Sequence, residues 1–542
     1  MKKEIKVWVT VLLVALALVA GVYWGSMSTV RKYGRTAALQ YDAGSAHTAK
    51  LNAIWRLVER NYVDNVDNDT VMDRVYSAML AALDPHSSYV PREELSKQEE
   101  TLRGNFEGVG IVIRKINDTV RVAQVMPGGP SEKAGLEAGD KLLQVDGITL
   151  SGCSMDLSDV VKHLRGPRKS IADLKISRPG EGGSRYVKVV RDIIMTPSIS
   201  YSGMLDDKTG YINLDSFTET SLDEFREALR SLKKQGMERL VFDLRGNGGG
   251  VMGAATGICD ELLGGNELIL YTQGAHDRRS EIHSRPGGLF TEGELIVMID
   301  EFSASASEIV AGAMQDNDRG IIAGRRSFGK GLVQRGIDLP DRSAVNLTVA
   351  RYYTPSGRCI QRPYDKGKES YAADFGKKLA AYAENKPEMQ PADSTPYYTT
   401  QGRVVYGGGG IWPDHTISYY SDTDFVYVNA LIYSGLINDF TFDMAAREGH
   451  NIKREYATGE DFVARYKVSD KTIEELLTRA EDAGLKRDKR SLAKYREEVR
   501  SRIKAEIGEM LYSNATFYAI EMRNDPDIIE AMKLFNKKKS VR

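Results

Sequence analysis

Two shortages in this sequence of 542 residues exclude whole classes of protein. Cysteine occurs only three times, at Cys153, Cys259 and Cys359, and this wide spacing forms neither a zinc-ligand pattern nor a disulfide framework. The chain also has no excess of positive or negative charge, because Lys and Arg number 74 and Asp and Glu 75, and it has no long basic tract. Nucleic-acid binding is therefore not indicated, and we expect neither a metal ion nor another cofactor.

A long apolar run occurs at the start of the chain, at residues 7–24, directly after the basic segment MKKEIK. It is at the short end of what spans a bilayer, and aromatic residues lie at its ends, as they do at membrane interfaces. No small-x-small cleavage site follows it cleanly. We predict an uncleaved single-pass anchor and linker over residues 1–45, with the remaining chain on the periplasmic side of the inner membrane. Export after signal cleavage is the alternative.

The spacing of apolar residues divides the rest of the chain into four regions. Residues 46–104 have helical spacing, whereas residues 105–192 alternate with a period of two and form a compact, mostly-β module. Residues 193–424 combine strands and helices, and their polar part at 366–400 is expected to be an irregular surface insertion. Residues 425–542 are mostly helical. The sequence therefore predicts a multidomain α/β protein with helical segments at both ends.

A run of small residues, EFSASASEIVAG at 301–312, follows a predicted buried strand and leads into a predicted helix. A purely structural role is sufficient, since serine is a common N-cap and Ser305-x-x-Glu308 has the form of a capping box. The same turn also offers chemistry, because the first amides of a helix are unpaired and can bind an oxyanion about 3 Å from a nucleophile. This stretch alone leaves both roles open.

A nucleophilic serine needs a base, and none of the seven histidines lies in a setting typical of one. The G-x-S-x-G motif is also missing. The other option is a lysine that burial keeps neutral, and Lys330 in RSFGKGLVQ is flanked by glycines, with Gln334 four residues later. The same segment matches most of a phosphate-binding loop, starting at Gly324, but Gly331 replaces the Ser or Thr that would hold Mg²⁺.

Glycines of another kind occur in DLRGNGGG at 243–250, directly after a predicted buried strand. A tight turn explains them fully. The functional alternative is a set of exposed amides at the carboxyl end of a strand, where sites of α/β proteins form. One of these amides could complete an oxyanion hole with the amide of Ala306.

These three motifs, with LTVARYYTPSGRCIQ and GGGIWPDHTI after them, resemble the bacterial C-terminal processing peptidases, or tail-specific proteases, over roughly residues 50–420. In that family the middle serine of S-A-S-A-S is the nucleophile, the lysine of F-G-K-G is the general base, and the glutamine four residues later orients the lysine. The residues that the resemblance implies here are Ser305, Lys330 and Gln334, with Ala306 and either Gly248 or Gly249 as oxyanion donors.

The family also carries a PDZ domain before its α/β peptidase core, and residues 105–192 fit it. FEGVGIVI at 106–113 looks like the carboxylate-binding loop, beside which a peptide would add as a strand. The peptide contacts implied by this resemblance are Gly108, Val109, Gly110 and Ile111. Arg165 would either relay peptide binding to the active site or be a solvated surface arginine.

The sequence is thus interpreted as that of an envelope-anchored serine endopeptidase that cleaves near the C-termini of exported proteins. Its expected partners are polypeptides with free C-termini and the membrane, without nucleic acid. A non-catalytic PDZ scaffold is the alternative function. The sequence leaves open whether the chain forms a homodimer, and whether residues 425–542 are a dimer interface, a substrate cap or a docking platform.

Overall fold

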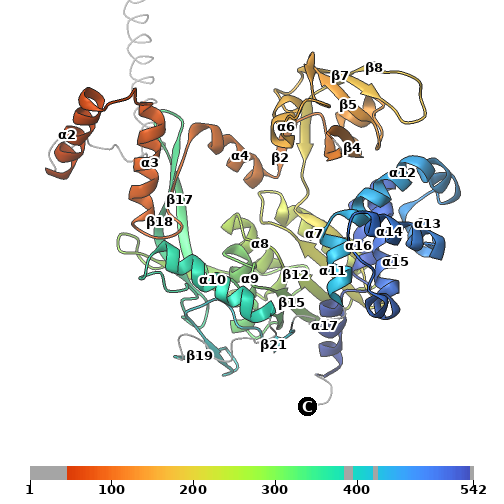
Figure 1. Ribbon diagram of the computed structural model, residues 1–542. Coiled ribbons are helices and arrows are strands. Elements are labelled where there is room, and N and C mark those ends of the chain that lie inside the picture. Colours follow the sequence, from red (N-terminus) through yellow and green to blue (C-terminus); the bar gives the residue numbers. More distant parts are fainter. Residues whose placement is uncertain (1–45, 117, 384–394, 419–424, 538–542) are drawn as a thin grey trace, which may run out of the picture. The chain divides into compact units, whose positions relative to one another are not determined.

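The computed structural model describes residues 46–116, 118–383, 395–418 and 425–537 (Figure 1). The predicted anchor at residues 7–24 lies outside these ranges. Among the described residues, no helix is both long and apolar enough to cross a membrane. The chain divides into two units, Met1–Val75 and Tyr76–Arg542. Helix α2 (Ala46–Asn61) belongs to the first unit, and α3 (Asn68–Ala81) begins in the first and ends in the second.

A six-stranded sheet forms the centre of the second unit, in the order β10-β11-β12-β15-β16-β21. The strands from β11 to β21 run parallel to one another, whereas β10 is antiparallel to β11, so the segments that follow the parallel strands emerge at one edge of the sheet. The bounds are β10 Ile199–Met204, β11 Thr209–Leu214, β12 Arg239–Asp243, β15 Glu294–Ile299, β16 Ile321–Gly324 and β21 His415–Thr416.

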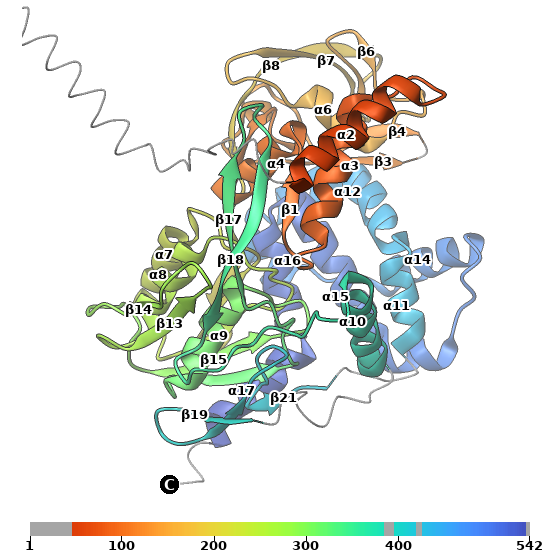
Figure 2. The same ribbon diagram turned by 90° about the vertical axis from the view of Figure 1, so that its left-hand side faces the viewer.

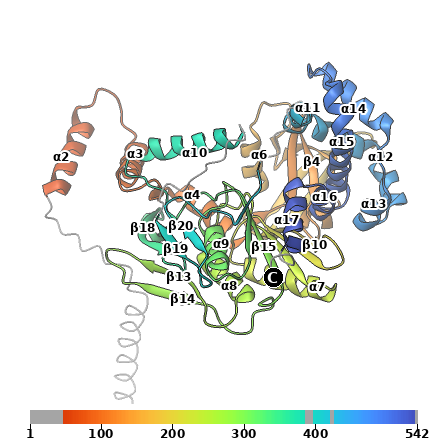
Figure 3. The ribbon, with the colours of Figure 1, turned by 90° about the horizontal axis from the view of Figure 1, so that it is seen from below.

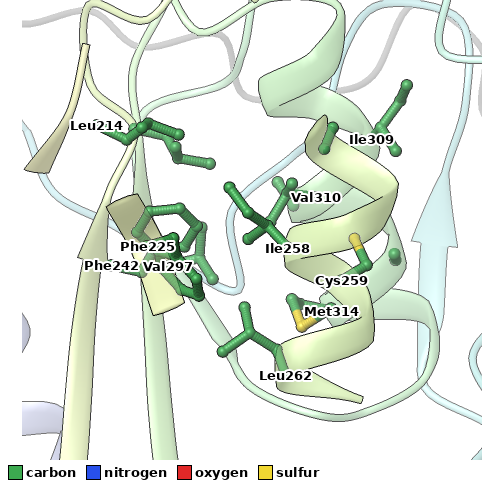
Figure 4. Close-up of a cluster of buried hydrophobic side chains, with 14 of the residues drawn as sticks. Leu214, Phe225, Phe242, Ile258, Cys259, Leu262, Val297, Ile309, Val310 and Met314 are labelled. Atoms are coloured by element: carbon green, nitrogen blue, oxygen red, sulfur yellow. The ribbon is translucent and has the colours of Figure 1, made fainter. Parts of the chain in front are cut away.

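Helices cover both faces of this sheet, which explains why β15 is apolar after Glu294 and β12 is apolar between Arg239 and Asp243. On one face, Phe242 and Val297 point toward α8 and α9, which lie side by side (Figures 3 and 4). Each fully buried side chain of this kind contributes roughly 1.5–3 kcal/mol. On the other face, Val241 and Ile296 pack against α17. The bounds are α7 Ser221–Lys234, α8 Met252–Leu262, α9 Ala306–Asp316 and α17 Pro526–Lys537.

A second, antiparallel sheet has the order β1-β18-β13-β14, with β17 also paired to β18 as a long hairpin (Figure 2). Strand β1 comes from the region at 46–104 that was expected to be helical. Its pairing with β18, far away in the sequence, explains why the local pattern did not reveal it. The bounds are β1 Ser88–Val90, β13 Leu268–Gln273, β14 Ser280–His283, β17 Leu332–Asp338 and β18 Ala344–Tyr353.

A mostly-β module is present, and its last strand runs to Met195, three residues beyond the predicted end at 192. Its sheet has the order β3-β4-β5-β7-β8, and β2 pairs separately with β9. The short helix α5 (Pro130–Lys133) and helix α6 (Leu157–Leu164) interrupt the strands, which are β2 Asn105–Gly108, β3 Ile111–Ile116, β4 Thr119–Val125, β5 Lys141–Val145, β6 Ile148–Thr149, β7 Ile171–Ser177, β8 Arg185–Val190 and β9 Asp192–Met195. Helix α4 (Arg92–Arg103) precedes the module.

The C-terminal region is helical, as predicted, and has its own apolar core. Its helices before α17 are α11 Val426–Tyr433, α12 Leu436–Glu455, α13 Gly459–Arg465, α14 Asp470–Asp482, α15 Lys489–Leu511 and α16 Asn514–Glu521.

The prediction of an irregular insertion at 366–400 is wrong for most of the described part. Lys368–Ala383 form helix α10, and β19 (Pro396–Tyr398) pairs with β20 (Val404–Tyr406). The helix is fixed by tertiary contacts, because Tyr371 and Phe375 pack against the ring of Phe328.

Candidate active site

Ser305 lies at the turn between β15 and α9, as the sequence predicted. Its φ of 54° is positive, which is rare for a residue other than glycine and costs backbone energy. Ser305 is partly exposed, whereas Ala304 and Ala306 on either side are buried. The strained turn thus leaves Ser305 accessible from a cavity of about 600 Å³, which it lines.

The other two serines of the stretch are fully buried and fix the turn to the glycine loop at 243–250. The Ser303 hydroxyl donates to the carbonyl oxygen of Leu244 at 2.8 Å. The Ser307 hydroxyl donates to the carbonyl oxygen of Asn247, also at 2.8 Å. Ser303 and Ser307 thus shape the turn, while Ser305 remains available.

The glycine loop passes very close to Ser305. A Cβ atom on Gly249 would lie 2.9 Å from the Cβ of Ser305, and the φ of Gly249 is +102°, so only glycine fits there. The Gly249 N–H donates to Asn247 Oδ1 at 2.9 Å and is therefore already used. Gly248 and Ala306 line the cavity with Ser305, and within the described ranges their N–H groups have no hydrogen-bond partner.

Lys330 lines the same cavity, in the segment that leads into β17. Its Nζ donates to Gln334 Oε1 at 2.8 Å, and Gln334 Nε2 in turn donates to the carbonyl oxygen of His86. Burial lowers the pKa of Lys330, although the charges of Glu308 and Asp84 oppose this shift. A strand follows Lys330 where a phosphate-binding loop would need a helix, which removes that alternative.

The Glu308 carboxylate joins the two segments. It is fully buried and accepts hydrogen bonds from the Ser305 N–H at 2.9 Å and the Lys330 N–H at 2.8 Å. Its other oxygen accepts from the Gly329 N–H at 2.7 Å and the Ser327 hydroxyl at 2.5 Å. Burial raises the pKa of Glu308, against the effect of these donors. Glu308, the predicted capping residue of α9, therefore also holds the backbone of Gly329 and Lys330.

Comparison with known proteins identifies families that match parts of the chain. The model of "Peptidase family S41" matches residues 208–366, that of "PDZ domain" matches residues 121–178, and a family of unknown function, DUF8443, matches residues 427–513. The carboxy-terminal-processing protease of Bartonella bacilliformis is 35% identical over 317 residues, which cover 58% of this chain and 72% of that protein. The chain belongs to the carboxy-terminal processing protease family.

Two further relatives match a similar share of the chain. The carboxyl-terminal-processing protease of a Picosynechococcus species is 36% identical over 329 residues, covering 56% of this protease and 77% of that protein. The carboxy-terminal processing protease CtpA of Bacillus subtilis is 29% identical over 366 residues, covering 67% and 76% respectively. The chain is therefore a peptidase with a PDZ domain, and the resemblance noted in the sequence is confirmed.

The PDZ domain of the protease places its predicted peptide contacts on one continuous segment. Gly108 ends β2, Ile111 begins β3, and Gly110 between them has a φ of +75°. The carbonyl oxygen of Val109 accepts hydrogen bonds from both the N–H and the hydroxyl of Ser131. These two hydrogen bonds to the buried Ser131 hold the loop in place.

Arg165 of the protease is paired rather than simply solvated. Its guanidinium donates to Glu100 of α4 and lies 4.6 Å from the ring centre of Phe106. A cavity of about 570 Å³ is lined by these three residues. Helix α4 also contributes Thr101 and Leu102 to the cavity that contains Ser305. One helix therefore borders both the PDZ domain and the active-site cavity.

His86 is a site residue that the sequence analysis missed. Its carbonyl oxygen orients Gln334, and its Nε2 lies 3.1 Å from the Tyr371 hydroxyl. Burial, with the charge of Lys330, lowers the pKa of His86 to about 4, so its ring is neutral at pH 7. Asp84 fixes this turn by accepting the N–H groups of His86 and Ser87, each at 2.8 Å. The only signal in the sequence was the break in helical spacing at LDPHSSYV.

Proposed function

We propose that this protease cleaves polypeptides near their carboxyl termini with Ser305 as nucleophile and Lys330 as general base. The observation that carries the proposal is the environment of Lys330. Its amine is largely buried, has a lowered pKa and donates to a neutral amide, Gln334, and no carboxylate among the described residues is its direct partner. A lysine in such a setting loses its proton more easily and can then accept one from a serine hydroxyl.

The reaction proceeds through an acyl-enzyme. Ser305 Oγ attacks the carbonyl carbon of the substrate while Lys330 Nζ takes the hydroxyl proton, and the carbonyl oxygen becomes an oxyanion. When this intermediate collapses, the C–N bond breaks and Lys330 gives the proton to the leaving amine. A water molecule then attacks the ester, Lys330 accepts its proton and returns it to Ser305 Oγ, and the new carboxyl terminus is released.

The oxyanion is received by the N–H groups of Gly248 and Ala306. Both line the cavity next to Ser305, and both are without another acceptor in the described part of the chain. Gly249 is a poorer donor, since its N–H is bonded to Asn247. Its own role is to let the loop approach Ser305 closely. Loss of one oxyanion donor typically lowers kcat by about 10²–10³.

Substrates are selected by the PDZ domain through their free C-terminal carboxylate. The segment from Gly108 to Ile111 provides the amides, and the Arg165–Glu100 pair lies between this domain and helix α4. Peptide binding that changes this pair would alter α4, which borders the active-site cavity. The substrates are exported proteins, and the apolar run at 7–24 anchors the protease on the periplasmic side of the membrane.

The proposed function is tested by Ser305→Ala. We expect this variant to bind a C-terminal peptide but to release no cleavage product, because no other group forms the acyl intermediate. The exposed residue Ser434, replaced by alanine, is a matched control that keeps full activity. Cleavage by Ser305→Ala at a rate near that of the unmodified protease would show that another residue is the nucleophile. Peptide binding without cleavage by the unmodified protein would instead favour the PDZ scaffold.

A further inference from the structure

Three loops carry the proposed chemistry, and each follows a parallel strand of the central sheet. The loop after β12 carries Gly248, the loop after β15 carries Ser305, and the loop after β16 carries Lys330. Catalysis depends on how these loops are placed relative to one another, because a hydrogen-bond donor must lie 2.7–3.1 Å from the developing oxyanion. An arginine follows two of the strands: Arg245 after β12 and Arg325 after β16.

Both arginines reach the same carboxylate at the start of α17. Asp527 Oδ2 lies 3.2 Å from Arg245 Nη1 and 2.9 Å from Arg325 Nη1. Asp525 Oδ2 accepts a further hydrogen bond, at 2.8 Å, from Arg245 Nη2. We call Asp525 and Asp527 the aspartate turn. The aspartate turn therefore links the loop that carries Gly248 to the loop that carries Lys330, although it lies far from both in the sequence.

The aspartate turn is rigidly held and largely shielded from water. Asp525 Oδ1 accepts the N–H groups of Asp527 and Ile528, at 2.8 and 3.1 Å, and so caps α17. The apolar side of α17 packs on the face of the sheet opposite α8 and α9. The side chain of Asp527 is only 13% exposed and that of Arg325 only 7%, so water weakens their interaction little.

Each arginine also has a second acidic partner. Arg245 pairs with Asp243 at 2.6 Å, and Arg325 with Glu301 at 3.0 Å. Neutralising Asp527 would therefore leave no buried arginine without a carboxylate. It would remove the negative charge that the two arginines share and leave each loop with its own ion pair. Asp527 thus contributes chiefly to the relative position of the loops.

We propose that the aspartate turn is a positioning device for catalysis, in which Asp527 aligns the Gly248 amide and Lys330 with Ser305. This inference rests on the proposed roles of Ser305 and Lys330. It assigns a task to α17, which lies beyond the matched families. Displacement of a catalytic group by about 1 Å can lower a rate about 10²-fold. The substrate-binding surface of the PDZ domain does not touch this turn in the described residues, so substrate affinity should not depend on it.

The test compares Asp527→Asn with Glu530→Gln, which removes a charge from an ion pair on the same helix. We expect Asp527→Asn to lower kcat at least tenfold with KM within twofold of the unmodified protease, and Glu530→Gln to leave both unchanged. Labelling of Ser305 by a fluorophosphonate should slow with kcat. Asp527→Glu keeps the charge and should recover much of the loss. Assays run well below each variant's unfolding temperature, measured by circular dichroism.

A folded Asp527→Asn variant with kcat within twofold of the unmodified protease would overturn the proposal. If this variant does not fold, Asp525→Asn decides, since asparagine caps a helix as well as aspartate does. A fall in kcat at constant KM for Asp525→Asn supports the positioning role, and an unchanged kcat refutes it. The Ser305→Ala result distinguishes a failure of the proposed function from a failure of the inference about the aspartate turn. Cleavage by that variant contradicts the proposed function, whatever Asp527 does.

Discussion

Replacing Glu308 by glutamine should damage the active site without touching a reacting atom. Glutamine keeps one carbonyl oxygen and exchanges the other for an NH₂ group. Each Glu308 oxygen accepts two hydrogen bonds, so at least two donors lose their acceptor in either orientation of the amide. A buried donor left unpaired costs about 1–3 kcal/mol, so the total is about 2–6 kcal/mol. At 1.36 kcal/mol per tenfold, even 2 kcal/mol expressed in the transition state lowers kcat about 30-fold.

The assay measures kcat with a peptide substrate and the unfolding temperature by calorimetry. Glu227→Gln, at an exposed position on α7, is the matched control and should change neither quantity. The cost for Glu308→Gln must appear in kcat, in the unfolding temperature or in both. A variant that keeps kcat within twofold and unfolds at the same temperature would refute the reasoning that Glu308 holds the serine and lysine segments.

Four other outcomes are expected. Lys330→Arg should be as inactive as Lys330→Ala in peptide cleavage, because arginine cannot lose its proton in a protein; more than about a tenth of normal kcat would exclude lysine as the base. The neutral fraction of Lys330 grows as pH rises, and burial lowers the pKa of this step, so kcat should increase through one ionisation and then level off. A peptide with an amidated C-terminus should bind to Ser305→Ala at least tenfold more weakly than the free acid in a calorimetric titration, since charge-assisted hydrogen bonds are worth about 1.5–3 kcal/mol; equal affinity would contradict carboxylate recognition. The full chain should remain with membranes after a salt wash, whereas a chain that begins near residue 40 should not; release of the full chain would count against the anchor.

The sequence by itself determined the parts of this protein whose physical cause is local. Apolar runs identified β12 and β15, and the small residues around Ser305 predicted the strand-to-helix turn. Glycines on both sides of Lys330 marked a backbone that passes close to a site. These signals depend on neighbouring residues, because propensity, turn geometry and apolar spacing act within one segment.

Only the tertiary structure decided which distant groups meet. Gln334 is oriented by His86, and Arg325 is paired with Asp527, in both cases across more than two hundred residues. Helix α10 was also missed, because its polar composition concealed the aromatic contacts that fix it. Hydrogen bonds and ion pairs of this kind have no period along the chain. Arg325 meets Asp527 because parallel strands end at one edge of the sheet, where the start of α17 lies. His86 reaches Gln334 because β1 and β17 both pair with β18.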